Sequence, residues 1–164
     1  MSRLQKRIEL IANVSIIVVA IVIGVAVGKR FLTKPSGPPA GIAAGTRINL
    51  PNEDWAGNGR TLLLALSTSC KYCSASAGFY HRLLASAPSK IRFVAVFPQS
   101  PEESKKYLNS LEVTIEDVKQ ISPSSIGVRG TPTLILVNSE GSVINSWVGL
   151  LSPEKEAEVL AVVR

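Results

Sequence analysis

The chain has few of the residues that most catalytic and metal sites require. Its 164 residues include one histidine, His81, and two cysteines, Cys70 and Cys73. It has no phosphate-binding loop, nucleophile elbow or zinc-protease motif. Tetrahedral zinc needs four ligands, and His81 lies about 12 Å along a helix from Cys73, so these three residues cannot share one ion. We therefore expect neither a metal ion nor a cofactor.

Most of the chain also has almost no surplus of basic over acidic residues, although the formal net charge is +6. Residues 1–34 hold six basic side chains and one acidic, whereas residues 35–164 hold 12 basic and 11 acidic. The surplus flanks an apolar run, where it meets anionic headgroups. No basic stripe with interleaved aromatic residues is present, so we expect no nucleic-acid partner.

The apolar run covers residues 10–28 and is interrupted only by Asn13 and Ser15. It has about the length that a helix needs to cross a bilayer. A cleavable signal peptide is the alternative, but its apolar core is about 7–15 residues long and ends at a small-x-small site, whereas this run continues into Lys29 and Arg30. We predict a single transmembrane helix over 10–28 after a short basic tail, 1–9. Each flank carries three basic residues, so charge leaves the orientation open.

Residues 29–45 are first basic and then rich in proline and glycine, which indicates a linker. The remaining residues, 46–164, alternate between strand and helix patterns. We predict strands at 46–50, 61–66, 91–97, 133–137 and 142–148, and helices at 70–87, 100–111 and 152–164. Residues 112–121 fit either an extended segment or a short helix. The order implies an α/β domain with a parallel core and an antiparallel edge.

Both cysteines lie in the motif Cys70-Lys71-Tyr72-Cys73, directly after the buried strand pattern. A helix N-terminus favours a thiolate, and the charge of Lys71 adds to this effect at Cys70. Cys73 lies one turn deeper on the same side, within reach of a disulfide. An inert structural disulfide and half of a zinc site are the alternatives. A bridge over so short a loop stabilises little, so a Cys70–Cys73 disulfide is more useful as an exchangeable one.

A second motif, Gly130-Thr131-Pro132-Thr133, follows about sixty residues later and precedes a hairpin and a final helix. Together the two motifs over residues 46–164 resemble the thioredoxin superfamily, and more closely the membrane-anchored TlpA-like thiol–disulfide oxidoreductases of bacteria. The resemblance implies a thioredoxin-like fold with a central mixed sheet flanked by helices. It implies that Cys70 attacks and Cys73 resolves. It also implies a cis Thr131–Pro132 bond packed against the pair, with the Thr131 backbone pairing with an extended substrate.

Three positions depart from the thioredoxin pattern. Ser69 stands where thioredoxins usually have tryptophan, Leu64 where they bury an acid, and Lys71-Tyr72 where they have Gly-Pro. Without the buried carboxylate, deprotonation of Cys73 must use water or another group. Redox potential depends on the intervening dipeptide, so the direction of electron flow is not predicted. Tyr72, between the two cysteines, is expected to contact a client.

The predicted function is disulfide exchange with client proteins by a monomeric, single-pass protein of the bacterial inner membrane. By the same resemblance the domain faces the periplasm or cell exterior, and a membrane redox protein recycles the pair. One alternative is a non-enzymatic module of the same fold that binds Cu(I), which soft thiolates prefer, or an assembly partner. Another is a thiol peroxidase, but the Thr-x-x-Cys arrangement of such enzymes is missing.

Overall fold

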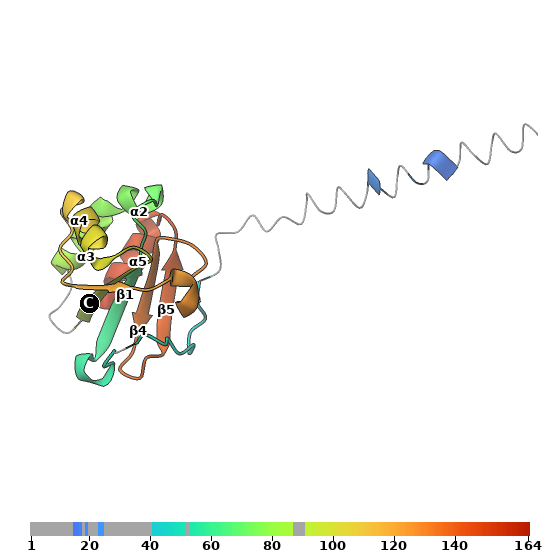
Figure 1. The fold of residues 1–164 in the computed structure, drawn as a ribbon. Helices are drawn as coiled ribbons and strands as arrows, with labels where there is room; N and C mark the ends of the chain where they lie inside the picture. The colour runs from blue at the N-terminus through green and yellow to red at the C-terminus, as the bar shows by residue number, and fades with distance from the viewer. Residues whose placement is uncertain (1–14, 18, 20–22, 25–40, 52, 87–90) are drawn as a thin grey trace, which may run out of the picture. The chain divides into compact units, whose positions relative to one another are not determined.

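The computed structural model describes residues 15–17, 19, 23–24, 41–51, 53–86 and 91–164 (Figure 1). The chain divides into two units, Met1–Gly37 and Pro38–Arg164. In the first, the six described residues are helical. None of the helices among the described residues is long and apolar enough to span a bilayer. Most of the helix predicted at 10–28 and of the linker predicted at 29–45, and the whole tail 1–9, lie outside the described residues.

The second unit is built on a five-stranded mixed sheet in the order β3-β2-β1-β4-β5. The strands β1, β2 and β3 are parallel, β4 pairs antiparallel with β1, and β5 pairs antiparallel with β4. This arrangement confirms the predicted parallel core with an antiparallel edge. The strand bounds are Arg60–Ala65, Ile91–Phe97, Asp117–Gln120, Thr133–Val137 and Val143–Val148 for β1 to β5. The ambiguous segment 112–121 therefore contains an edge strand.

Strand β1 is buried on both faces, as its unbroken apolar run predicts. Leu62 and Leu64 face a cluster that also contains residues of α3 (Ala77–Ser86), α4 (Pro101–Ser110) and α5 (Pro153–Val163). Leu63 and Ala65 face a second cluster on the other side of the sheet. Ile48, Leu50 and the short 3₁₀ helix η2, Pro123–Ile126, contribute to that second cluster. The sheet is thus covered by helices on one face and mainly by loop segments on the other.

The strand predicted at 46–50 is wrong. Arg47 makes a single bridge to Ser142. The backbone of Thr46 bonds Val143 at the start of β5, and the backbone of Ile48 bonds Gly141 in the turn before it. Ile48 and Leu50 instead turn inward and are 3% and 5% exposed. Their alternating pattern, which also fits a strand, reflects contact with the core and not extended pairing.

The single helix predicted at 70–87 is divided in two. Helix α2 covers Lys71–Ala75, and α3 begins at Ala77. Ser76 lies at the break, and its hydroxyl donates a 2.8 Å hydrogen bond to the carbonyl of Tyr72. A serine that bonds the carbonyl four residues back commonly bends a helix, which explains the division. Cys70 is the N-cap residue and not part of the helix.

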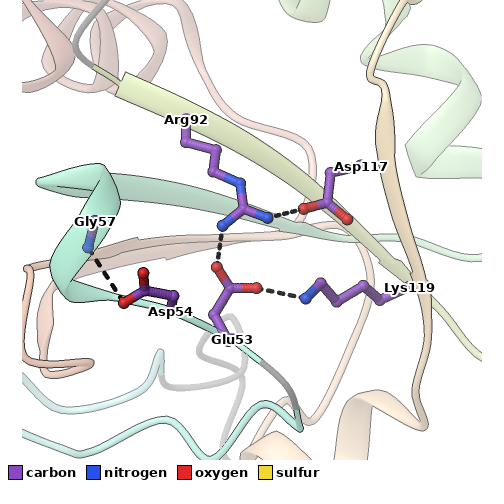
Figure 2. A network of polar contacts seen from close by, with 6 residues as sticks. All are labelled: Glu53, Asp54, Gly57, Arg92, Asp117 and Lys119. Atoms are coloured by element: carbon purple, nitrogen blue, oxygen red, sulfur yellow. Dashed lines mark hydrogen bonds and ion pairs between the residues drawn. The ribbon is translucent and has the colours of Figure 1, made fainter.

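A buried carboxylate ties the segment before β1 to the parallel edge of the sheet (Figure 2). The Glu53 side chain is fully buried and pairs with Arg92 of β2 and Lys119 of β3. Arg92 also pairs with Asp117 at the start of β3. The partners of Glu53 lie 39 and 66 residues away, so this network joins three distant parts of the chain.

Candidate functional site: a dithiol beside a cis-proline

Cys70 lies in the turn between β1 and α2, where its sulfur is partly exposed. It caps the helix, because its Sγ accepts a 3.2 Å hydrogen bond from the backbone N–H of Cys73. In the thiol form, the same sulfur donates to the carbonyl of Thr131 at 3.1 Å. Burial alone would raise its pKa. Hydrogen bonds from the side chains of Cys73 and Thr131 and from the backbone of Cys73 and Tyr72 outweigh that effect. They lower the pKa of Cys70 below its ordinary value of 9.0.

Cys73 lies one turn further along and is fully buried. Burial, and the hydrogen bond that its thiol gives to the Cys70 sulfur, raise its pKa to about 12. Both cysteines are free thiols in this structure. The turn therefore holds an accessible sulfur that ionises readily beside an enclosed sulfur that keeps its proton.

The Thr131–Pro132 peptide bond is cis, as the resemblance implies. Pro132 is buried and Thr131 is half-buried, and the 3.1 Å contact of the Thr131 carbonyl brings this turn against Cys70. The carbonyl of Pro132 accepts a 2.7 Å hydrogen bond from the N–H of Gly149, at the end of β5. The Thr131–Pro132 turn thus joins the cysteine turn on one side to the end of β5 on the other.

Two apolar side chains near this meeting point face solvent. Tyr72 is 47% exposed and Leu150 is 52% exposed. Leu150 follows Gly149, whose positive φ of 84° turns the chain beside Pro132. The sequence interpretation overlooked Leu150. Its only signal is a Gly-Leu-Leu run after the hairpin, which by itself fits core packing equally well.

The dithiol turn is held against α4 by polar side chains. Gln99 donates to the Ser67 hydroxyl at 3.2 Å, and the Thr68 hydroxyl donates to Glu103 at 3.0 Å. Ser69 shares a 3.1 Å hydrogen bond with Ser67. The exposed position before Cys70 therefore has a role in shaping the turn. Leu64 is buried in the same cluster as Cys73, so no carboxylate occupies that position in the core.

A family model described as a thioredoxin-like domain matches residues 55–164. The chain belongs to this thioredoxin-like family. No curated protein sequence matches it. Among solved structures, it is similar to the thioredoxin domain of a thiol-disulfide oxidoreductase from Bacteroides vulgatus, with 16% identity and a TM-score of 0.55 over 75% of this chain and 99% of that one.

Two further solved structures have the same fold. A thiol-disulfide isomerase from Corynebacterium glutamicum has 13% identity and a TM-score of 0.54, over 79% of this chain and 96% of that chain. StoA from Bacillus subtilis has 17% identity and a TM-score of 0.52, over 76% of this chain and 98% of that chain. At these identities the likeness establishes the thioredoxin-like fold.

The charge of Lys71 suggested an interaction with Cys70, but the contact observed for its ammonium is with Tyr72. The ammonium is placed over the ring of Tyr72, with 4.9 Å between Nζ and the ring centroid. The groups that lower the pKa of Cys70 are the side chains of Cys73 and Thr131 and the backbone N–H groups of Cys73 and Tyr72. A direct effect of the Lys71 charge on the pKa of Cys70 therefore stays a prediction. His81 is exposed and bonds the carbonyl of Leu111 at 2.8 Å, away from the site.

We expect alkylation of Cys70 by iodoacetamide to become faster with rising pH, with a midpoint below pH 9. The thiolate is the reactive form, and the Cys70 pKa lies below 9.0. Cys73, with a pKa of about 12, should stay unmodified in this range. Mass spectrometry of the reduced chain at each pH measures both rates. A midpoint at or above pH 9 would contradict the expectation. Lys71→Gln measures the contribution of the ammonium, and its removal should move the midpoint upward.

Proposed function

We propose that the chain is a membrane-anchored thiol–disulfide oxidoreductase that exchanges disulfides with proteins outside the cytoplasm. The observation that carries the exchange reaction is the contrast between the two thiols, one accessible with a lowered pKa and one buried with a pKa of about 12. Membership of the thioredoxin-like family together with this dithiol supports an oxidoreductase.

The reaction follows from the geometry of the pair. The Cys70 thiolate attacks a client disulfide, and one client sulfur leaves as a thiol while the other stays bonded to Cys70. Cys73 then attacks the Cys70 sulfur, so that a Cys70–Cys73 disulfide forms and the second client sulfur leaves reduced. Run backward, the same steps oxidise a client dithiol. No cofactor takes part in either direction.

We assign client contact to the exposed surface around Cys70. The Thr131 backbone is the element expected to pair with an extended client segment, next to Pro132. Tyr72 and Leu150 offer exposed apolar surface for such contact. Clients are proteins that carry thiols or disulfides, and the domain is proposed to act as a monomer.

The anchor is the apolar run at 10–28, with the thioredoxin-like domain on the periplasmic or outer side of the bacterial inner membrane. The run's length and its basic flanks support this assignment. A membrane redox protein is the proposed donor or acceptor of electrons for the dithiol. Carbonate extraction of membranes, and protease accessibility of the domain in spheroplasts, test the anchor and its orientation.

The exchange reaction is tested by equilibrating the full-length protein, in detergent, with glutathione redox buffers. We expect the Cys70–Cys73 pair to interconvert as a two-electron couple with a midpoint potential between about −300 and −120 mV, the range of exchange proteins. The fraction of each form is read after acid quenching and thiol labelling. A pair that stays wholly reduced or wholly oxidised over that range would overturn the proposal.

A further inference from the structure

The phenol of Tyr80 is a buried polar group that no part of the exchange reaction described above uses. Tyr80 is 0% exposed. Among the residues that the structure describes, its hydroxyl is the one buried side-chain nitrogen or oxygen without a hydrogen-bond partner. Such groups are rare in folded proteins because burial removes the hydrogen bonds they make to water. A retained one therefore points to a partner that appears in another state of the protein.

Tyr80 lies in the same buried cluster as Cys73 and Leu64. It follows Cys73 by seven residues. The Ser76 N–H bonds the Tyr72 carbonyl and the Tyr80 N–H bonds the Ser76 carbonyl, so helical spacing continues through the break and places Tyr80 on the same side as Cys73. Long helical side chains lean toward the N-terminus of their helix, which for Tyr80 is the direction of Cys73. Burial raises the pKa of the Tyr80 phenol, the charge of the Cys73 sulfur raises it further, and the nearby Ser76 side chain lowers it in part. The Ser76 hydroxyl already donates to the carbonyl of Tyr72. The phenol thus remains a neutral donor while Cys73 ionises.

The other groups around the Cys73 sulfur are already engaged. Cys70 is itself a reacting group. The Thr131 carbonyl accepts from the Cys70 sulfur, and the Thr131 side chain is a donor that the two sulfurs share, since it lowers the pKa of both. The Tyr107 hydroxyl, from α4, shares a 3.0 Å hydrogen bond with Ser74. The backbone of Ser67 favours the Cys73 thiolate but lies in the turn, fixed by the fold. Tyr80 supplies the additional side-chain donor.

Building on the proposed exchange function, we propose that the Tyr80 hydroxyl donates a hydrogen bond to the Cys73 thiolate when that sulfur attacks the mixed disulfide. In this step the Cys73–Cys70 bond forms and the bond between Cys70 and the client sulfur breaks. The client sulfur keeps the electron pair of the broken bond and takes a proton from water. The proton of Cys73 is released to water, and Tyr80 keeps its own. The phenol thereby assists the ionisation of Cys73 in a core where Leu64 replaces an acid.

The test uses reduced full-length protein in detergent and one equivalent of Ellman's reagent in a stopped-flow instrument. Attack by Cys70 releases the first thionitrobenzoate, and attack by Cys73 on the resulting mixed disulfide releases the second. Tyr80→Phe should leave the first phase within about twofold and slow the second about 3- to 10-fold at pH 7. Loss of a hydrogen bond to a charged sulfur reduces its thiolate fraction, and the greater nucleophilicity of the more basic thiolate recovers part of the rate.

A thermal unfolding measurement separates this role from a structural one. Because the Tyr80 hydroxyl has no partner in the reduced protein, Tyr80→Phe should raise the unfolding midpoint by a few degrees. A residue needed only for packing would show the opposite change, and a destabilised Tyr80→Phe variant would overturn the proposal. So would a second phase that keeps its wild-type rate, or one that slows in step with the first phase.

Tyr107→Phe is the matched control, because it removes a phenolic hydroxyl near the same sulfur that is already bonded to Ser74. It should leave the second phase unchanged, and equal slowing in both variants would overturn the assignment to Tyr80. Failure of the exchange function itself looks different. In that case the wild-type protein releases no second thionitrobenzoate at all.

Discussion

Replacing Cys73 with serine is expected to stop the exchange reaction at the mixed disulfide. Cys70 keeps its exposure, its lowered pKa and its contact with Thr131, so it still attacks client disulfides. The buried sulfur that would displace the client is missing. Adducts that are absent from the wild type should therefore accumulate through Cys70, visible as higher bands on non-reducing gels that disappear with dithiothreitol.

The matched variant is Cys70→Ser, which keeps the other sulfur. Cys73 is 0% exposed, and burial, the largest cause of its raised pKa, persists in this variant, so little of it is ionised at pH 7. We expect this variant to form no adducts and to lose at least about 1000-fold in exchange rate. Equal trapping by the two variants would show that either thiol can attack, and the assigned order of the cysteines would be wrong.

Replacing Glu53 with glutamine is expected to be the most destabilising single change outside the core. The carboxylate is fully buried between Arg92 and Lys119. Removing one partner of a fully buried ion pair costs about 3–5 kcal/mol. Here Arg92 keeps Asp117, and Lys119, whose side chain is 19% exposed, loses its partner. The amide of glutamine can keep a hydrogen bond but not the charge, so we expect a loss near the lower end of that range. Urea unfolding of the reduced protein measures it.

Asp117→Asn provides the control within the same network. Asp117 is 27% exposed, and in the described part of the chain its ion pair is with Arg92, which keeps Glu53 as its partner. The expected loss is about 0–1 kcal/mol, as for other solvent-exposed ion pairs. If the Glu53 and Asp117 variants lost similar amounts of stability, the network would behave as a surface cluster, and burial of Glu53 would not be its decisive property.

Local sequence signals were sufficient where the cause of a structure is local. An apolar run buried on both faces identified β1. The helix predicted over 100–111 is observed as α4, and the Ser100 hydroxyl caps it by accepting the N–H of Glu103 at 3.3 Å. The hairpin of β4 and β5 followed from the turn at 138–141, where Gly141 has a positive φ of 78°. Each of these depends on contacts within a few residues.

The helix break at Ser76 and the irregular segment at 46–50 were not predicted, because their causes lie in competing contacts. Ser76 fits a helix by spacing, but its hydroxyl bonds the chain one turn back. Residues 46–50 alternate like a strand, but Ile48 and Leu50 are drawn into the core behind the sheet. A pattern of alternating apolar residues reports which side chains are buried and does not report what covers them.

The sequence alone determined the dithiol and most strands and helices of the domain, because these depend on short motifs and on the period of apolar residues, and the resemblance to thioredoxins implied the cis-proline turn. Tertiary structure alone decided how the two sulfurs differ, since burial of Cys73 and the hydrogen bonds at Cys70 come from segments up to 61 residues apart. It also placed Glu53 between two cations and left the Tyr80 hydroxyl without a partner. Desolvation and charge act through space, so these properties arise only when distant segments have packed together.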